Sequence, residues 1–199
     1  MSIIDKIIIL WNILRFRHAG VQFGKGLRVR GHIQLQVRKG GRVTLGNNVT
    51  ISSGNNANPM GRNICSSIRV HEGATLTIGN NFGMSSGCLR VSQDVSIGNN
   101  VKIGALTIIT DTDAHSMNPV LRANPKTDFA NARKAPIIIK NNAFIGANCF
   151  VCKGVTIGEN SIVGACSVVT KSIPDNEIWA GNPARYIKKL VVKNEDTNI

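Results

Sequence analysis

One histidine stands close to carboxylates in a stretch that departs from the regular pattern of the chain around it. His115 lies in the segment DTDAHS, which covers residues 111–116. An imidazole that titrates near neutral pH can take the proton of a hydroxyl or an amine as that group attacks. A nearby carboxylate would orient the ring, and Asp113 or Asp111 could supply it if the loop folds back. We therefore predict His115 as a general base with Asp113 as its acidic partner.

Aliphatic residues recur at every sixth position on both sides of this segment, and glycine often follows them. The positions are Val91, Ile97, Ile103 and Ile109, then Ile139, Ile145, Val151, Ile157, Val163 and Val169. Toward the N-terminus the pattern weakens to Leu27, Ile33, Leu45 and Ile51. A short strand and turn repeated every six residues cannot bury its apolar face alone, so it must stack on its neighbours. Three such units per coil make a parallel β-helix.

The composition supports an all-β solenoid and disfavours helices. Aromatic residues make up 5% of the 199 residues, and Asn-rich corners such as Gly98-Asn99-Asn100 recur between the aliphatic positions. Asn and Gly tolerate the left-handed backbone conformation of tight corners. In a helix each glycine would cost about 1 kcal/mol, and a spacing of six matches no helical period.

The two ends should differ from the coils, because a terminal coil would otherwise expose a bare apolar cross-section. Residues 1–20 are expected to form an amphipathic helix that caps the solenoid of residues 21–183, with one apolar face made of Ile3, Ile4, Ile7, Ile8, Trp11 and Leu14. Another interpretation is that residues 3–16 lie on a membrane surface. Residues 184–199 are expected to form a short C-terminal helix, from Ala184 to Val192, followed by a polar tail.

Two insertions interrupt the repeat, at about residues 52–67 and 110–136. Loops of this length within a compact domain are usually functional. The second one carries His115.

Charge and cysteine content restrict the partners and the compartment. The net charge of +13 calls for an anionic partner, which could be nucleic acid, an acidic membrane surface or a phosphate-rich cofactor. The basic residues have no adjacent aromatic ladder, so we expect no nucleic-acid binding. Five cysteines without the spacing of a secreted framework favour the cytoplasm. The N-terminus does not resemble a signal peptide, and no apolar run reaches 18 residues.

The hexapeptide pattern, the interrupting loop with His115, the segment VVTKSIP (residues 168–174) and the segment GNPAR (residues 181–185) resemble one known family. They are similar to the maltose/galactoside O-acetyltransferase branch of the left-handed β-helix acyltransferases, from about Ile78 to Leu190. This resemblance implies a left-handed helix and a homotrimer with acetyl-CoA lying between neighbouring solenoids. It also implies that His115 deprotonates the acceptor, which then attacks the thioester directly.

The same resemblance assigns the binding residues. Positions near the pantetheine arm are matched by Ala147, Ala165, Thr170 and Lys171, and cationic positions near the CoA phosphates by Arg185 and Lys188. On the acceptor side the matching residues are Ser85 and Ser86, where the family often shows Ala-Asn. Phe144 stands where the family commonly has Trp.

We expect no metal site, because His18, His32, His71 and His115 are too scattered for a three-histidine zinc centre. The expected function is transfer of acetyl from acetyl-CoA to a saccharide hydroxyl, in a surface polysaccharide or its lipid-linked precursor. The alternatives are N-acetylation of an amino sugar or small amine, and a non-catalytic scaffold. The protein is expected in the cytoplasm, or peripherally at the inner membrane surface.

Overall fold

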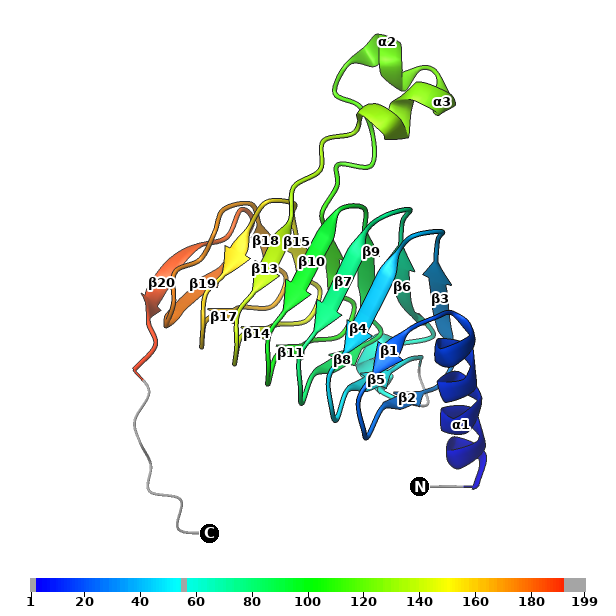
Figure 1. Ribbon diagram of the computed structural model, residues 1–199. Coiled ribbons are helices and arrows are strands. Elements are labelled where there is room, and N and C mark those ends of the chain that lie inside the picture. The colour runs from blue at the N-terminus through cyan, green and yellow to red at the C-terminus, as the bar shows by residue number, and fades with distance from the viewer. Residues whose placement is uncertain (1–2, 55–56, 192–199) are drawn as a thin grey trace.

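The chain winds into a three-sided β-helix (Figure 1). The structure is a computed structural model, and it describes residues 3–54 and 57–191. Strands β1 to β18 fall in turn on three sheets, β19 and β20 both join the second sheet, and every strand pair is parallel except the last. The predicted all-β parallel β-helix is confirmed, and the arrangement agrees with the left-handed class.

The first sheet, A, contains β1 (Gln22–Phe23), β4 (Arg42–Leu45), β7 (Thr75–Ile78), β10 (Asp94–Ile97), β13 (Ile137–Ile139) and β16 (Thr156–Ile157). Sheet B contains β2 (Arg28–Arg30), β5 (Thr50–Ser52), β8 (Gly83–Ser85), β11 (Lys102–Ile103), β14 (Phe144–Ile145), β17 (Ile162–Val163), β19 (Glu177–Ala180) and β20 (Arg185–Lys189). Sheet C contains β3 (Ile33–Val37), β6 (Ser66–Val70), β9 (Cys88–Val91), β12 (Ile108–Thr110), β15 (Phe150–Val151) and β18 (Val168–Val169).

The aliphatic positions of the six-residue repeat form columns through the interior. Ile103, Ile145 and Val163 lie directly above one another in register and are buried. The weaker early positions continue the same pattern, since Leu27 and Ile51 are also buried. The repeat therefore extends to the first coil, although its sequence signal fades there.

Asparagines in the left-handed conformation occupy the corner between sheets A and B, as predicted, and they form a hydrogen-bonded ladder from coil to coil. Asn100, Asn142 and Asn160 have positive φ angles of 59°, 60° and 58°. The side-chain amide of Asn100 donates to Asn142 at 2.9 Å, and that of Asn142 donates to Asn160 at 2.9 Å. Each corner is thus fixed by its own backbone conformation and by the corners above and below it.

The N-terminal helix α1 (Ile3–His18) lies across the open end of the first coil (Figure 1). Phe16 is fully buried there. The Asn12 side-chain amide donates to the carbonyl oxygens of Val29 at 3.0 Å and Gly31 at 2.9 Å. These carbonyls belong to the terminal coil, which has no preceding coil to pair with. The predicted capping helix is present, and it closes this edge.

The prediction that the apolar face of α1 packs on the first coil is wrong. Its residues Ile3, Ile4, Ile7, Trp11 and Leu14 are 76, 68, 61, 62 and 49% exposed. Apolar residues occur on all sides of α1, so their spacing in the sequence does not identify the side that faces the first coil. Hydrogen bonding to the coil edge selects the side that carries the polar residue instead.

The C-terminal helix predicted from Ala184 to Val192 is also wrong. Residues Arg185–Lys189 form strand β20, which pairs antiparallel with β19. Without β20, β19 would be the last strand of sheet B, and its outer backbone groups would lack the partners that β20 supplies. Residues 192–199, which include Val192 and the expected tail, lie outside the described residues.

Both expected insertions are present. The first contains the 3₁₀ turn η1 (Pro59–Gly61) between β5 and β6. The second contains α2 (Pro119–Arg122), α3 (Pro125–Asp128) and η2 (Phe129–Asn131), and it stands away from the coils (Figure 1). It leaves after a sheet C strand, β12, and returns to a sheet A strand, β13. Among the described helices, none is long and apolar enough to cross a bilayer.

The cap on the first coil yields a stability prediction. Asn12→Ala leaves two carbonyls without partners beneath the helix, which typically costs about 1–3 kcal/mol. We expect thermal unfolding to shift to lower temperature, measured by circular dichroism. Leu10→Ala is the matched control, because Leu10 on the same helix is 59% exposed. Equal losses in the two variants would contradict the proposed edge cap.

Candidate active site

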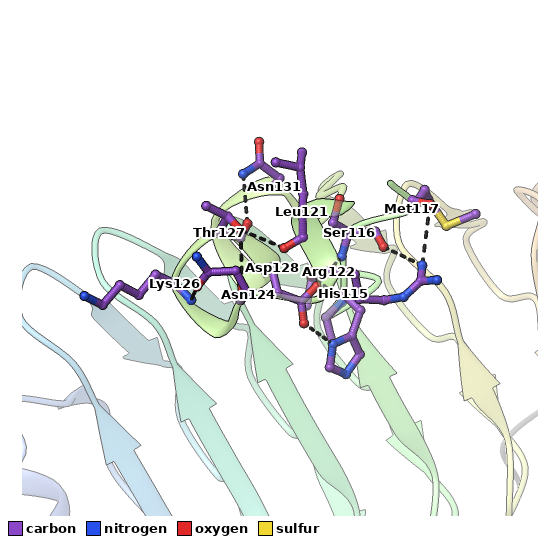
Figure 2. A network of polar contacts seen from close by, with 12 residues as sticks. His115, Ser116, Met117, Leu121, Arg122, Asn124, Lys126, Thr127, Asp128 and Asn131 are labelled. Atoms are coloured by element: carbon purple, nitrogen blue, oxygen red, sulfur yellow. Dashed lines mark hydrogen bonds and ion pairs between the residues drawn. The ribbon is translucent and has the colours of Figure 1, made fainter. Parts of the chain in front are cut away.

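The long insertion folds back on itself to pair its histidine with a carboxylate (Figure 2). Nδ1 of His115 lies 2.6 Å from Oδ2 of Asp128, at the end of α3. The other carboxylate oxygen accepts the backbone N–H of Ser116 at 2.7 Å. Arg122 donates to the Ser116 carbonyl oxygen at 2.9 Å. Asp128 is thus held at two points of the segment that carries the histidine.

Short capped helices produce this return. Asn118 and Asn124 precede α2 and α3, and their side chains accept the backbone N–H groups of Val120 and Lys126. Each is followed by proline, which favours the first position of a helix. The repeated Asn-Pro pair therefore turns the chain twice and brings Asp128 to His115.

The geometry suits proton transfer. When Nδ1–H is donated to Asp128, the Nε2 lone pair is free to accept a proton. The His115 side chain is 69% exposed, so a substrate can reach it. The hydrogen bond from His115, followed by that from the Ser116 amide, lowers the pKa of Asp128. The carboxylate therefore stays ionised at neutral pH and can stabilise an imidazolium.

The predicted role of Asp113 as the partner of His115 is wrong. Asp113 instead pairs with Lys153, with 2.6 Å between Oδ1 and Nζ. Asp111 is fully buried, and its two oxygens accept the backbone N–H groups of Ser92 and Gln93. Burial raises the pKa of Asp111. Both residues near His115 in sequence are therefore engaged elsewhere, whereas Asp128, the third carboxylate of the insertion, reaches it.

An aromatic contact anchors the end of the loop, and sequence reasoning missed it. Phe129 follows Asp128, and its ring centroid lies 4.8 Å from that of His71. The cations of Arg90 and Lys134 lie 5.7 and 5.0 Å from the Phe129 centroid. Burial, followed by the charge of Arg90, lowers the pKa of His71, so a neutral ring faces the aromatic side chain. These contacts hold the residue next to Asp128 against the solenoid.

A groove on sheet B gathers several of the residues predicted to bind substrates. It has a volume of about 370 Å³ and is lined by Ser85, Ala147 and Ala165, with Met60 of the first insertion also on its wall. A Cβ at Gly146 would lie 2.5 Å from the Ala165 nitrogen, so neighbouring coils approach closely at this corner. The groove is largely apolar and suits a narrow flexible chain.

The other predicted binding residues do not line this groove. Arg185 and Lys188 lie exposed on β20, at the end of the same sheet. Thr170 and Lys171 are exposed at the corner after sheet C. Ser86 is 2% exposed, and its hydroxyl oxygen accepts the Gly54 backbone N–H, so its predicted contact with substrate is wrong.

His115 and the groove lie at different corners of the solenoid. The groove contains segments that link sheet B to sheet C, such as 146–147 between β14 and β15. The His115 loop instead links sheet C to sheet A. The parallel ladders fix these corners. Within one chain, His115 and the groove therefore lie on different edges of the three-sided β-helix.

The pairing of Asp128 predicts a response to acid. Because its folded pKa is depressed, its hydrogen bonds are complete at neutral pH and are lost as pH falls through that pKa. We expect the Ser116 amide resonance to titrate with a midpoint below the ordinary aspartate value of about 3.9. Asp113→Asn should leave that midpoint in place, while Asp128→Asn should abolish the titration. A midpoint at or above the ordinary value would contradict the pairing.

Sequence comparisons point to one repeat family. Residues 136–171 match the model for bacterial transferase hexapeptide (six repeats). The chain is 41% identical over 96 residues to galactoside O-acetyltransferase of Escherichia coli (strain K12), covering 48% of this chain and 44% of that protein. It is 34% identical over 110 residues to "Putative lipopolysaccharide biosynthesis O-acetyl transferase WbbJ" of the same strain, covering 54% and 55%. It thus spans about half the length of the curated relatives it matches.

Solved structures show the same architecture. AntD, an N-acyltransferase from Bacillus cereus, matches with a TM-score of 0.69 and 20% identity over 90% of this chain and 88% of that chain. A maltose O-acetyltransferase from Clostridium difficile 630 matches with a TM-score of 0.55 and 24% identity, over 89% and 73%. The chain is thus similar to the bacterial transferase hexapeptide family in its repeat, and it shares the fold of these solved structures.

Proposed function

We propose that the protein transfers an acetyl group from acetyl-CoA to a saccharide hydroxyl, with His115 as general base. The observation that carries this proposal is the contact between His115 and Asp128 on a loop that interrupts a hexapeptide β-helix. A scaffold subunit would need neither a loop folded around a histidine nor a carboxylate aimed at its ring. The AntD structure, which contains 3-hydroxybutyryl-CoA, supports a CoA thioester as donor in this fold.

The reaction needs no covalent intermediate on the protein. Nε2 of His115 takes the proton of the acceptor hydroxyl as its oxygen attacks the thioester carbonyl. The tetrahedral intermediate then collapses, the C–S bond breaks, and the CoA sulfur takes the proton back from the imidazolium. Asp128 stabilises the imidazolium throughout and keeps Nδ1 as a donor. Backbone amides along the coil corner would stabilise the oxyanion.

We infer that the complete site lies between two copies of the chain. The groove that suits the pantetheine arm is at the corner between sheets B and C, while His115 is at the corner between sheets C and A. A homotrimer with parallel solenoids would bring the groove of one copy to the loop of the next. Thr170 and Lys171 would then reach the donor from the histidine side, with Arg185 and Lys188 of the groove-bearing copy near its phosphates.

The relatives favour a saccharide acceptor. They include proteins named for acetyl transfer to galactosides and for lipopolysaccharide biosynthesis. We therefore propose a surface polysaccharide or its precursor as the acceptor class. We place the reaction in the cytoplasm, where acetyl-CoA is made, and the five free cysteines among the described residues agree with a reducing compartment.

The test of this function is acetyl-CoA turnover with a panel of saccharides and amino sugars, followed as free CoA thiol. General-base catalysis is worth about 10²–10⁴ in rate, so His115→Ala should lose at least about 100-fold while CoA binding survives. Asp128→Asn should also reduce kcat, because it removes the charge that stabilises the imidazolium.

Asp113→Asn serves as the matched control, since it removes a carboxylate of the same loop that contacts Lys153 rather than His115. It should retain near-normal kcat. Thiol release that is indifferent to His115→Ala would remove the histidine from the reaction. The absence of both CoA binding and turnover would overturn the enzyme proposal.

A mixing experiment tests the shared site. Ala165→Trp should block the groove of its own copy, and His115→Ala should disable the loop of its own copy. When the two inactive variants are refolded together, some interfaces pair an intact groove with an intact histidine, so activity should return in part. Each variant refolded alone is the control. Mixtures as inactive as the single variants would place the whole site within one chain.

A further inference from the structure

The outer face of the N-terminal helix is largely exposed to solvent, and at its edge Trp11 and Leu14 line a shallow hollow together with Leu35. While Asn12 and Phe16 turn toward the first coil, the opposite side of α1 presents large apolar side chains to solvent. Each of these side chains is about half exposed or more: Ile3, Ile4, Ile7, Leu10, Trp11 and Leu14. We call this set the outer face of α1. Six large apolar side chains that are exposed side by side on one helix mark an interaction site.

The outer face points away from the solenoid along its axis. Asn12 and Arg15 donate to the carbonyls of Val29, Gly31 and Ile33, which belong to the first coil. In a β-helix these main-chain bonds run along the axis, so a helix bound to them lies across the end. A flat surface could thus meet the protein end-on, without a collision with the coils (Figure 1).

The N-terminal part of the chain carries most of the net positive charge. Residues 1–71 contain eleven lysines and arginines and a single acidic residue, Asp5. They therefore hold ten of the thirteen net positive charges, although they make up little more than a third of the 199 residues. Lys25, Arg28 and Arg30 are exposed on the first coil, next to the helix. The apolar face thus lies beside a basic surface.

We propose that α1 docks on a lipid bilayer that carries anionic headgroups. The outer face would enter the boundary between headgroups and acyl chains, with Trp11 at the depth that indoles favour. The neighbouring lysines and arginines would contact the negatively charged headgroups. A helix that lies in the plane of the surface agrees with α1, because it is not long and apolar enough to span the membrane. A protein partner with an apolar groove would leave the surrounding excess of cations without a counterpart.

The docking does not depend on the reaction proposed above, and it can be tested separately. The full chain is mixed with vesicles of phosphatidylcholine alone or with added phosphatidylglycerol, and bound protein is separated by flotation. We expect binding to the anionic vesicles that weakens with salt. The double variant Ile7→Ser/Trp11→Ser should lower this binding by at least about tenfold, because two large apolar side chains no longer enter the bilayer.

Two controls make the test decisive. Ile64→Ser removes an apolar side chain that is 53% exposed in the first insertion, and it should leave binding intact. The double variant should keep its unfolding temperature and its turnover of a soluble acceptor, since the two side chains are 61 and 62% exposed and belong neither to the groove nor to the His115 loop. The proposal is overturned if the double variant binds as well as the unchanged chain. It is also overturned if the lipid-free protein forms oligomers larger than a trimer and the double variant does not, because the outer face then binds another copy of the chain.

Discussion

The main-chain hydrogen bonds that run along the solenoid axis are the constraint on which this structure depends. The N–H of Gly104 donates to Ile145, that of Gly146 to Val163 and that of Gly164 to Trp179, each at 2.7–2.8 Å. Each coil therefore completes the one below it, and the two ends would remain open. Helix α1 closes the first end with side-chain donors, whereas strand β20 closes sheet B at the other end with its own backbone.

The same ladder lets a long loop leave the solenoid without disturbing it. Strand β12 ends at Thr110, and β13 resumes in register on β10, with Val95 opposite Ile137. Asp111 holds two backbone N–H groups where the loop departs, and Phe129 packs on the solenoid where it returns. Because the core is complete without the loop, a polar and exposed histidine can be placed there at little cost to stability.

The three-sided β-helix also keeps the groove, the histidine loop and helix α1 apart in space. Its corners put the apolar groove on one edge and the histidine on another, so the proposed reaction requires two copies. Helix α1, with its exposed apolar side chains, lies at one end of the solenoid axis, and the His115 loop leaves the coils farther along that axis (Figure 1). A surface could therefore hold the protein at its first coil while the groove and His115 stay accessible to substrates.

The sequence by itself determined the solenoid, its Asn corners, the interrupting loop and His115, because a six-residue period is a local property that each coil repeats. The tertiary structure decided the rest. Asp128 rather than Asp113 meets the histidine, since two capped turns carry a distant carboxylate back. Residues 185–189 became a strand because the open edge of β19 offered partners. Asn12 selected the inward face of α1, since the unpaired carbonyls of the first coil require donors. Such choices depend on contacts between residues far apart in the chain, which periodicity does not record.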